Sequence, residues 1–281
     1  GPMAEDVMTS PRVAPAMIGL GLLELIPEAD ILALADPDDR NKDGISGKAQ
    51  QTYSQNLKRV ALGRFGWKAG MATIDEQNQA AFAGDIGIST PLHPNGFGEC
   101  TQHQHECRTA PDGNSEQYEG LEAHKEVTDL VLTYARNLAL PMRRDAADTQ
   151  VLQGKRVFHQ AGCAQCHTPS FTTGNEGSEP HLRNQHIWPY TDLLLHDMGE
   201  GLADNRPEGL ANGREWRTAP LWGIGATEVV SGHTNFLHDG RARNLLEAIL
   251  WHGGEAEASR DHVISLGTQD REALIRFLES M

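Results

Sequence analysis

The feature that most constrains this chain is the pentapeptide Cys163-Ala-Gln-Cys166-His167. Two thiols at this spacing can form thioethers with the two vinyl groups of one porphyrin, and an imidazole in the next position then lies over the iron. The pattern is the signature of c-type haem attachment. A helical pattern precedes it, whereas strands flank the redox cysteines of thioredoxin-like proteins. We therefore predict one haem c, attached through Cys163 and Cys166, with His167 as a ligand of its iron.

The other two cysteines, Cys100 and Cys107, lie in a polar loop that also contains His103 and His105. They predict either a disulfide or, with the two histidines, a metal site. We favour the disulfide, because haem c is attached outside the cytoplasm, where thiols oxidise. The same reasoning predicts a periplasmic or otherwise extracytoplasmic location.

The charge of the chain narrows its partners. It has 39 acidic and 24 basic residues and a formal net charge of −15. Phosphate backbones would be repelled, so no nucleic-acid partner is expected. No stretch approaches the roughly 20 continuous apolar residues of a membrane span, so no membrane insertion is expected either. A redox partner protein with a basic surface, or a small electron donor, would suit the charge, although solubility alone also explains it.

Apolar residues recur at helical spacing in a few short segments. The first has Leu121, Val127, Leu130, Val131, Tyr134 and Leu138 on its apolar face, and the last has Thr268 as its expected N-cap. Long stretches between the segments are rich in Gly, Asn and Pro and predict loops. The expected fold class is therefore mainly α, with short helices and long loops. The helical segments are 121–138, 151–162, 245–250 and 268–278.

The haem motif and the last helix together resemble a class I cytochrome c domain. Gly154-x-x-x-Phe158 precedes the motif, and the closing helix carries Leu274, Phe277 and Leu278. In the class I fold the first and last helices cross, and the glycine permits their close approach.

Three further segments resemble the bacterial di-haem cytochrome c peroxidase superfamily, and most closely its branch of di-haem oxidoreductases, sometimes called thiol oxidoreductases. The likeness covers nearly the whole chain and is densest from residue 151 onward. It implies haem-mediated electron transfer in a peroxidase-like enzyme that carries two haems c. The segments are Leu195-His-Asp-Met-Gly199, Arg217-Thr-Ala-Pro-Leu-Trp-Gly223 and Phe236-Leu-His-Asp-Gly-Arg241.

The resemblance also implies a sixth ligand for the iron. Relatives carry it on a helix after the His-Asp-Gly turn, as Met or Tyr, and the corresponding residue here is His252. Ligation by two imidazoles would give a low-spin iron with a lower reduction potential than His/Met ligation. Met198 is the alternative, but core packing explains it, because relatives have an aliphatic residue there. His238 is expected to bind near the haem edge through a structural hydrogen bond, and His233 is a weaker candidate ligand.

Relatives have two cytochrome domains, each with its own Cys motif, whereas this sequence has one motif. The first hundred residues echo the later half: Ala14-Pro15 corresponds to Ala219-Pro220, and, with gaps, Phe65-Gly-Trp-Lys-Ala-Gly70 corresponds to Phe236-Leu-His-Asp-Gly240.

We therefore expect an N-terminally truncated protein, whose opening Gly1-Pro2-Met3 is typical of a protease remnant. Residues 1–142 would be the remnant of a first cytochrome c-like domain with a loop-rich insertion and a helix. Residues 143–281 would be a complete c-type cytochrome domain.

A possible calcium loop begins at Asp39. Asp39, Asn41 and Asp43 occupy its positions one, three and five, and Gly44 occupies position six. Position twelve should be a bidentate Glu but is Gln50. A tight turn without an ion explains the pattern equally well. If an ion binds, the hard oxygen ligands predict calcium.

Three functions stay open. The first is an oxidoreductase of the di-haem peroxidase type, in which this part of the protein alone would be a poor peroxidase. The second is a periplasmic electron carrier without enzymatic activity. The third is a structural or metal-handling protein in which haem fills the core. Peroxide turnover supports the first, and a low-spin spectrum that does not respond to peroxide, cyanide or CO supports the second.

Overall fold

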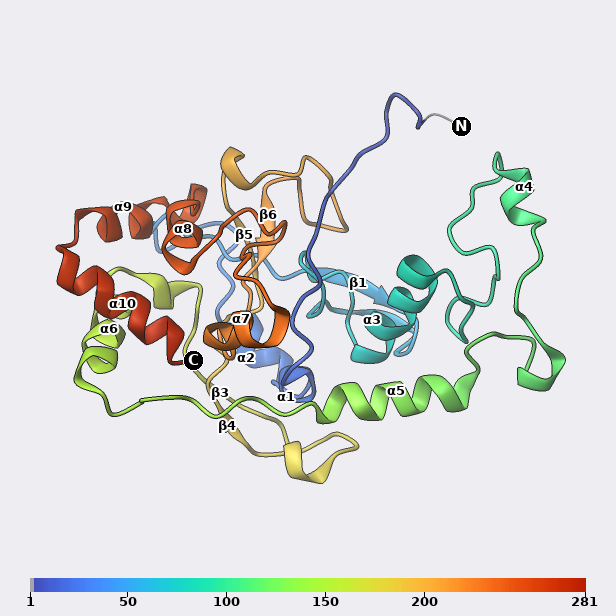
Figure 1. The fold of residues 1–281 in the computed structure, drawn as a ribbon, viewed down its shortest axis with the longest axis horizontal. Coiled ribbons are helices and arrows are strands. Elements are labelled where there is room, and N and C mark those ends of the chain that lie inside the picture. Colours follow the sequence, from blue (N-terminus) through green and yellow to red (C-terminus); the bar gives the residue numbers. More distant parts are fainter. Residues whose placement is uncertain (1–2) are drawn as a thin grey trace.

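The computed structural model describes residues 3–281, so Gly1 and Pro2 of the expected protease remnant lie outside the described residues. The fold is mainly helical with little sheet, as the sequence predicts (Figure 1). Its helices are short because glycine, proline and polar loop residues interrupt the apolar patterns. Among the described residues, no helix is both long and apolar enough to cross a bilayer.

Two helices distant in sequence cross in the later half of the chain. They are α6 (Thr149–Gln160) and α10 (Thr268–Glu279) (Figure 1). Asp148 is the N-cap of α6, and its carboxylate accepts hydrogen bonds from the backbone N–H groups of Gln150 and Val151. At the crossing, a Cβ on Gly154 would lie 1.9 Å from the carbonyl oxygen of Ala273. Only glycine lets the two backbones come this close.

The core of the later half is built around this crossing. Phe158 of α6 packs edge-to-face on Tyr190, with ring centroids 5.7 Å apart, and contacts Phe277 of α10. The predicted apolar face of α10 is confirmed, since its three members are buried. Thr268 is the first residue of α10 rather than its N-cap, because the backbone is still extended at Gly267. The helices α7 (Thr227–Ser231), α8 (Leu245–Leu250) and α9 (Glu257–Ser265) complete this part.

The earlier half has a second core. Its elements are α1 (Leu20–Glu24), α2 (Glu28–Leu32), the antiparallel pair β1 (Gln51–Ser54) and β2 (Arg59–Leu62), and α3 (Ile74–Ala81). Residues from the later half complete this core: Phe171 of β3 (Phe171–Thr172), Ile187 of β4 (His186–Ile187), Leu193 and Leu194. Residues of both halves of the chain therefore pack together in this second core.

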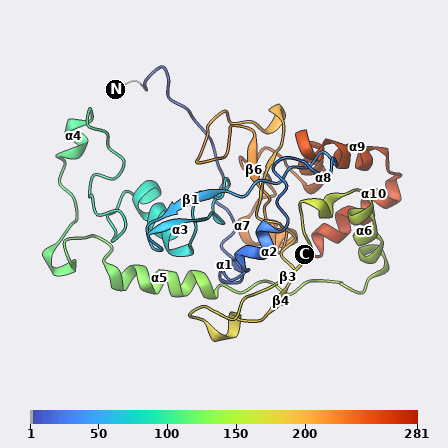
Figure 2. The same ribbon diagram turned by 180° about the vertical axis from the view of Figure 1, so that it is seen from behind.

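Residues 87–119 extend from the body as an arm that carries α4 (His105–Arg108) and returns through α5 (Lys125–Asn137) (Figures 1 and 2). The predicted disulfide between Cys100 and Cys107 is confirmed and closes the tip of the arm. The side chains of His103 and His105 are exposed.

The predicted apolar face over 121–138 is wrong in part: Leu121 is buried and Val131 and Leu138 are half-buried, but other members face solvent. Leu130 and Tyr134 are 66% and 67% exposed, whereas Thr128 and Ala135 are buried. α5 packs against α1 and α3, and small side chains allow the closer approach. Periodicity showed that a helix forms here but not which face the neighbouring helices cover.

Candidate functional site

A cavity of about 1170 Å³ lies between the two halves of the molecule. Its volume lies just above the usual range of roughly 300–1,000 Å³ for small-molecule and cofactor pockets. One wall comes from the short sheet β5 (Leu195–Asp197) and β6 (Glu215–Arg217), in which His196 lies opposite Trp216. The predicted site residues on its lining are Cys163, Cys166, His167, Met198, His233, His238 and His252.

The two cysteines of the haem motif lie in a tight turn after α6. The turn begins at Gly162, whose φ of +81° favours glycine. Burial raises the pKa of Cys163 to about 12 and also raises the pKa of Cys166. Catalytic redox cysteines have lowered pKa values instead. The structure thus argues against thioredoxin-like chemistry at this motif.

His167 is oriented for a metal ion. Its Nδ1 lies 2.9 Å from the carbonyl oxygen of Tyr190. Since the carbonyl can only accept, Nδ1 donates and Nε2 keeps its lone pair for a ligand bond. Burial lowers the pKa of His167 to about 4, so the ring is neutral at neutral pH.

His252 is held in the same manner at the end of α8. Its Nδ1 donates to the carbonyl oxygen of Ala248 at 2.8 Å, and burial lowers its pKa. His167 and His252 both line the cavity. Met198 lines the same cavity. The structure therefore brings both predicted imidazole ligands, and the alternative ligand, to one site.

His238 is buried at the cavity but makes no side-chain hydrogen bond with any residue that the structure describes. The expected hydrogen bond of His238 near the haem edge therefore stays a prediction. The ring of His238 stacks on Trp216, with centroids 3.6 Å apart and planes 14° apart. His233 is exposed at the cavity rim.

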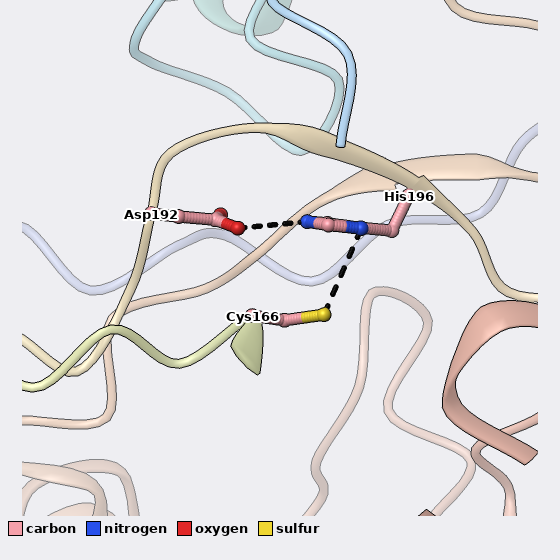
Figure 3. A group of neighbouring side chains, drawn as sticks. All are labelled: Cys166, Asp192 and His196. Atoms are coloured by element: carbon pink, nitrogen blue, oxygen red, sulfur yellow. Dashed lines mark hydrogen bonds and ion pairs between the residues drawn. The ribbon is translucent and has the colours of Figure 1, made fainter. Parts of the chain in front are cut away.

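No role was predicted from the sequence for His196, which the structure places in a buried cluster (Figure 3). Its two ring nitrogens lie 2.8 Å from Asp192 and 2.8 Å from Glu255. The Sγ of Cys166 lies 3.6 Å from its Nδ1. Burial alone would lower the pKa of His196, but these hydrogen bonds outweigh burial and hold it well above its usual value.

Cys166, Asp192 and His196 are close enough together to suggest a metal site, since their ligand atoms lie within 4.8 Å of one another. An imidazolium that donates from both nitrogens has no lone pair for a metal. The cluster is therefore better explained as a charged hydrogen-bond network beside the haem motif. The likeness of the segment Leu195–Gly199 to relatives was the only sequence signal for it.

In the predicted calcium loop, the candidate ligand side chains bind backbone N–H groups of the loop itself. The side chains of Asp39, Asn41 and Asp43 each accept a hydrogen bond from a backbone N–H of the loop. Gln50, at position twelve, is buried and bonds to backbone groups elsewhere. It does not join the loop, and calcium binding stays a prediction.

Two turns at the cavity, 65–71 and 236–242, have the same backbone conformation. This likeness supports the internal repeat, and it aligns the two turns without the gap that the sequence comparison needed. In each turn, an isolated β-bridge joins the first residue to the residue six positions later. The backbone has a left-handed conformation at the second and fifth residues. A helix N-cap follows two residues after the bridge. The matched pairs are Phe65 with Phe236, Gly66 with Leu237, Ala69 with Gly240, Met71 with Ala242, and Thr73 with Asn244. Gly240 thus matches Ala69 rather than Gly70, and His238 matches Trp67.

The Cys-x-x-Cys-His turn and two oriented imidazoles on a large cavity are the features of a protein that holds haem c. A family model described as "Di-haem oxidoreductase, putative peroxidase" matches residues 2–281. The chain belongs to this di-haem oxidoreductase family, as the sequence predicts.

No curated protein matches the chain. Among solved structures, the chain is similar to "Kuenenia stuttgartiensis Hydrazine Synthase Pressurized with 20 bar Xenon". That match has 14% sequence identity and a TM-score of 0.39, and it covers 100% of this chain and 95% of the other.

Proposed function

We propose that this chain transfers electrons through one haem c, which Cys163 and Cys166 would attach and for whose iron His167 and His252 would be the ligands. The observation that carries the proposal is the matched orientation of the two imidazoles. Each donates from Nδ1 to a backbone carbonyl, so each presents Nε2 for a ligand bond beside the two thiols. The haem would supply reversible one-electron chemistry.

The residues present fit such a group. The lining is chiefly apolar, and the cavity is large enough for a porphyrin. The neutral, buried state of His167 suits a ligand, because only a neutral imidazole has a free lone pair. The chain's own part is to exclude water, to hold both rings in place and to keep the thioether sulfurs buried.

The crossing of α6 and α10 at Gly154 supports a class I cytochrome c-like domain over residues 143–281. We propose that residues 1–142 include the remnant of a first such domain, because their turn 65–71 repeats the turn 236–242 at the same cavity. The residue that matches His252 in this repeat is Ala81, which offers no ligand. A haem held beside this repeat would therefore receive no ligand from this position.

The disulfide supports a periplasmic or other extracytoplasmic location. The net charge of −15 supports a basic redox partner protein, or a small electron donor. A second candidate function is an electron carrier without enzymatic activity. Ligation on both sides favours it for this haem, since no coordination position would be left for peroxide.

The test is a pyridine haemochrome spectrum and an intact mass of protein produced with the haem attachment machinery. We expect one haem per chain, and no haem in a Cys163→Ser/Cys166→Ser variant. Wild-type protein without a Soret band and without a mass gain would refute the proposal. Steady-state peroxide reduction with a reduced donor then separates enzyme from carrier.

A further inference from the structure

Two buried arginines, Arg64 and Arg217, line the cavity with only backbone oxygens as partners. Their residues are 9% and 6% exposed. Arg217 donates from Nε to the carbonyl oxygen of Gly66 at 2.8 Å and from Nη1 to that of Thr218 at 3.0 Å. Arg64 donates from Nη1 to the carbonyl oxygen of Leu23 at 3.2 Å. Each guanidinium has five N–H donors, so most of these donors have no protein partner among the described residues.

Neither arginine forms a salt bridge with any residue that the structure describes. The acidic side chains whose charge reaches them are Glu24, Glu28 and Asp192. Glu24 already binds Arg136, and Asp192 already binds His196. The cavity wall therefore holds two cations that lack an anion.

A buried cation without an anion is unfavourable, and a group that brings carboxylates into the cavity would remove this penalty. Burial lowers the pKa of Arg217 only to about 10, so the guanidinium stays charged at neutral pH. The backbone N–H and the Nε of Arg217 both bind the turn 64–67, which brings Arg217 beside the segment that carries Arg64.

We infer that Arg64 and Arg217 form a carboxylate site that binds the propionate groups of the haem in this cavity. The inference rests on the proposed function, because the haem must be attached at Cys163 and Cys166. Planar guanidinium groups match carboxylates in geometry, and charge-assisted pairs are the strong ones. The two arginines come from different halves of the chain, so the same contacts would join the halves around the haem.

The test uses the haem-loaded protein and the variants Arg217→Gln and Arg64→Gln. Each variant should lower the reduction potential, because removing a nearby cation favours the oxidised iron. In redox difference infrared spectra with ¹³C-labelled propionates, each variant should shift the propionate carboxylate bands. A matched control is Arg12→Gln. Arg12 precedes Ala14-Pro15 as Arg217 precedes Ala219-Pro220, but it already pairs with Asp204 and Glu208.

Arg12→Gln should leave both the potential and the propionate bands unchanged. Haem present in full amount with unchanged bands and potential in both arginine variants would overturn the inference but not the proposed function. Wild-type protein without haem would instead refute the proposed function.

Titration with acetate separates a free carboxylate ligand from the propionates. A saturable shift of the potential in wild type, lost in Arg217→Gln, would assign the arginines to a free ligand and overturn the inference. If Arg217→Gln does not fold, Arg64→Gln alone decides.

Discussion

The side chains around the cavity are oriented by backbone groups and by charged partners. His167 and His252 each donate from Nδ1 to a carbonyl oxygen. His196 is fixed on both sides by carboxylates, and one of them, Glu255, lies three residues after His252. Such second contacts set the tautomer and direction of an imidazole, and they decide how firmly it binds a metal. The strength of the haem site therefore depends on residues that do not touch the iron.

At this scale, the first prediction concerns His252. His252→Ala should convert a low-spin haem to a high-spin haem, because the iron would lose its sixth ligand. Visible and electron paramagnetic resonance spectra of the haem-loaded protein report the change. Met198→Leu is the matched control and should leave the low-spin spectrum unchanged. An unaltered spectrum in His252→Ala with a high-spin spectrum in Met198→Leu would identify Met198 as the ligand.

Among the elements, the crossing of α6 and α10 positions the haem motif. The chain leaves α6 at Gln160 and enters the Cys turn within three residues. Any change in the crossing would therefore move the two thiols relative to the cavity. The close approach depends on the missing side chain of Gly154, since the carbonyl oxygen of Ala273 occupies its place.

Gly154→Ala should destabilise the protein by about 3 kcal/mol or more, because the clash is with backbone that cannot rotate away. Urea unfolding followed by circular dichroism measures the loss. Gly84→Ala is the control, as no heavy atom lies within 4 Å of a Cβ there. It should change the free energy of unfolding by less than about 1 kcal/mol. Equal stabilities of the two variants would show that the helices do not cross as described.

In the whole molecule, buried charges join segments distant in sequence. Lys68 is fully buried, and its Nζ lies 2.7 Å from Asp204. Burial alone would raise the pKa of Asp204, but hydrogen bonds from Lys68, the backbone of Arg206 and Ser10 lower it to about 2. The lowered pKa stabilises the fold at pH values above the ordinary carboxyl pKa. This stabilisation is lost as pH falls from about 4 towards 2.

Asp204→Asn should lower the free energy of unfolding at pH 7 by about 2 kcal/mol. The variant should also lose less stability than wild type between pH 5 and pH 2, because it lacks this titrating group. Urea unfolding at several pH values measures both effects. Asp129→Asn is the control, since its ion pair with Lys125 is exposed and should contribute little to stability. Parallel pH profiles for wild type and Asp204→Asn would contradict the assigned pair.

The sequence alone predicted the family, the haem motif, the three longest helices (α5, α6 and α10) and the short helix α8, and it favoured the disulfide. These features depend on residue spacing and local periodicity, which are written directly in the chain. His167 and the candidate ligand His252 could be named because each stands at a fixed offset from a recognisable motif.

Only the tertiary structure decided which helix faces are covered, as the exposed Leu130 and Tyr134 of α5 show. It also brought His196 to Glu255 and placed Arg64 in the same cavity wall as Arg217. These arrangements join residues tens to more than a hundred positions apart. Burial and ion pairing between such residues depend on how the whole chain packs, and no local pattern encodes them.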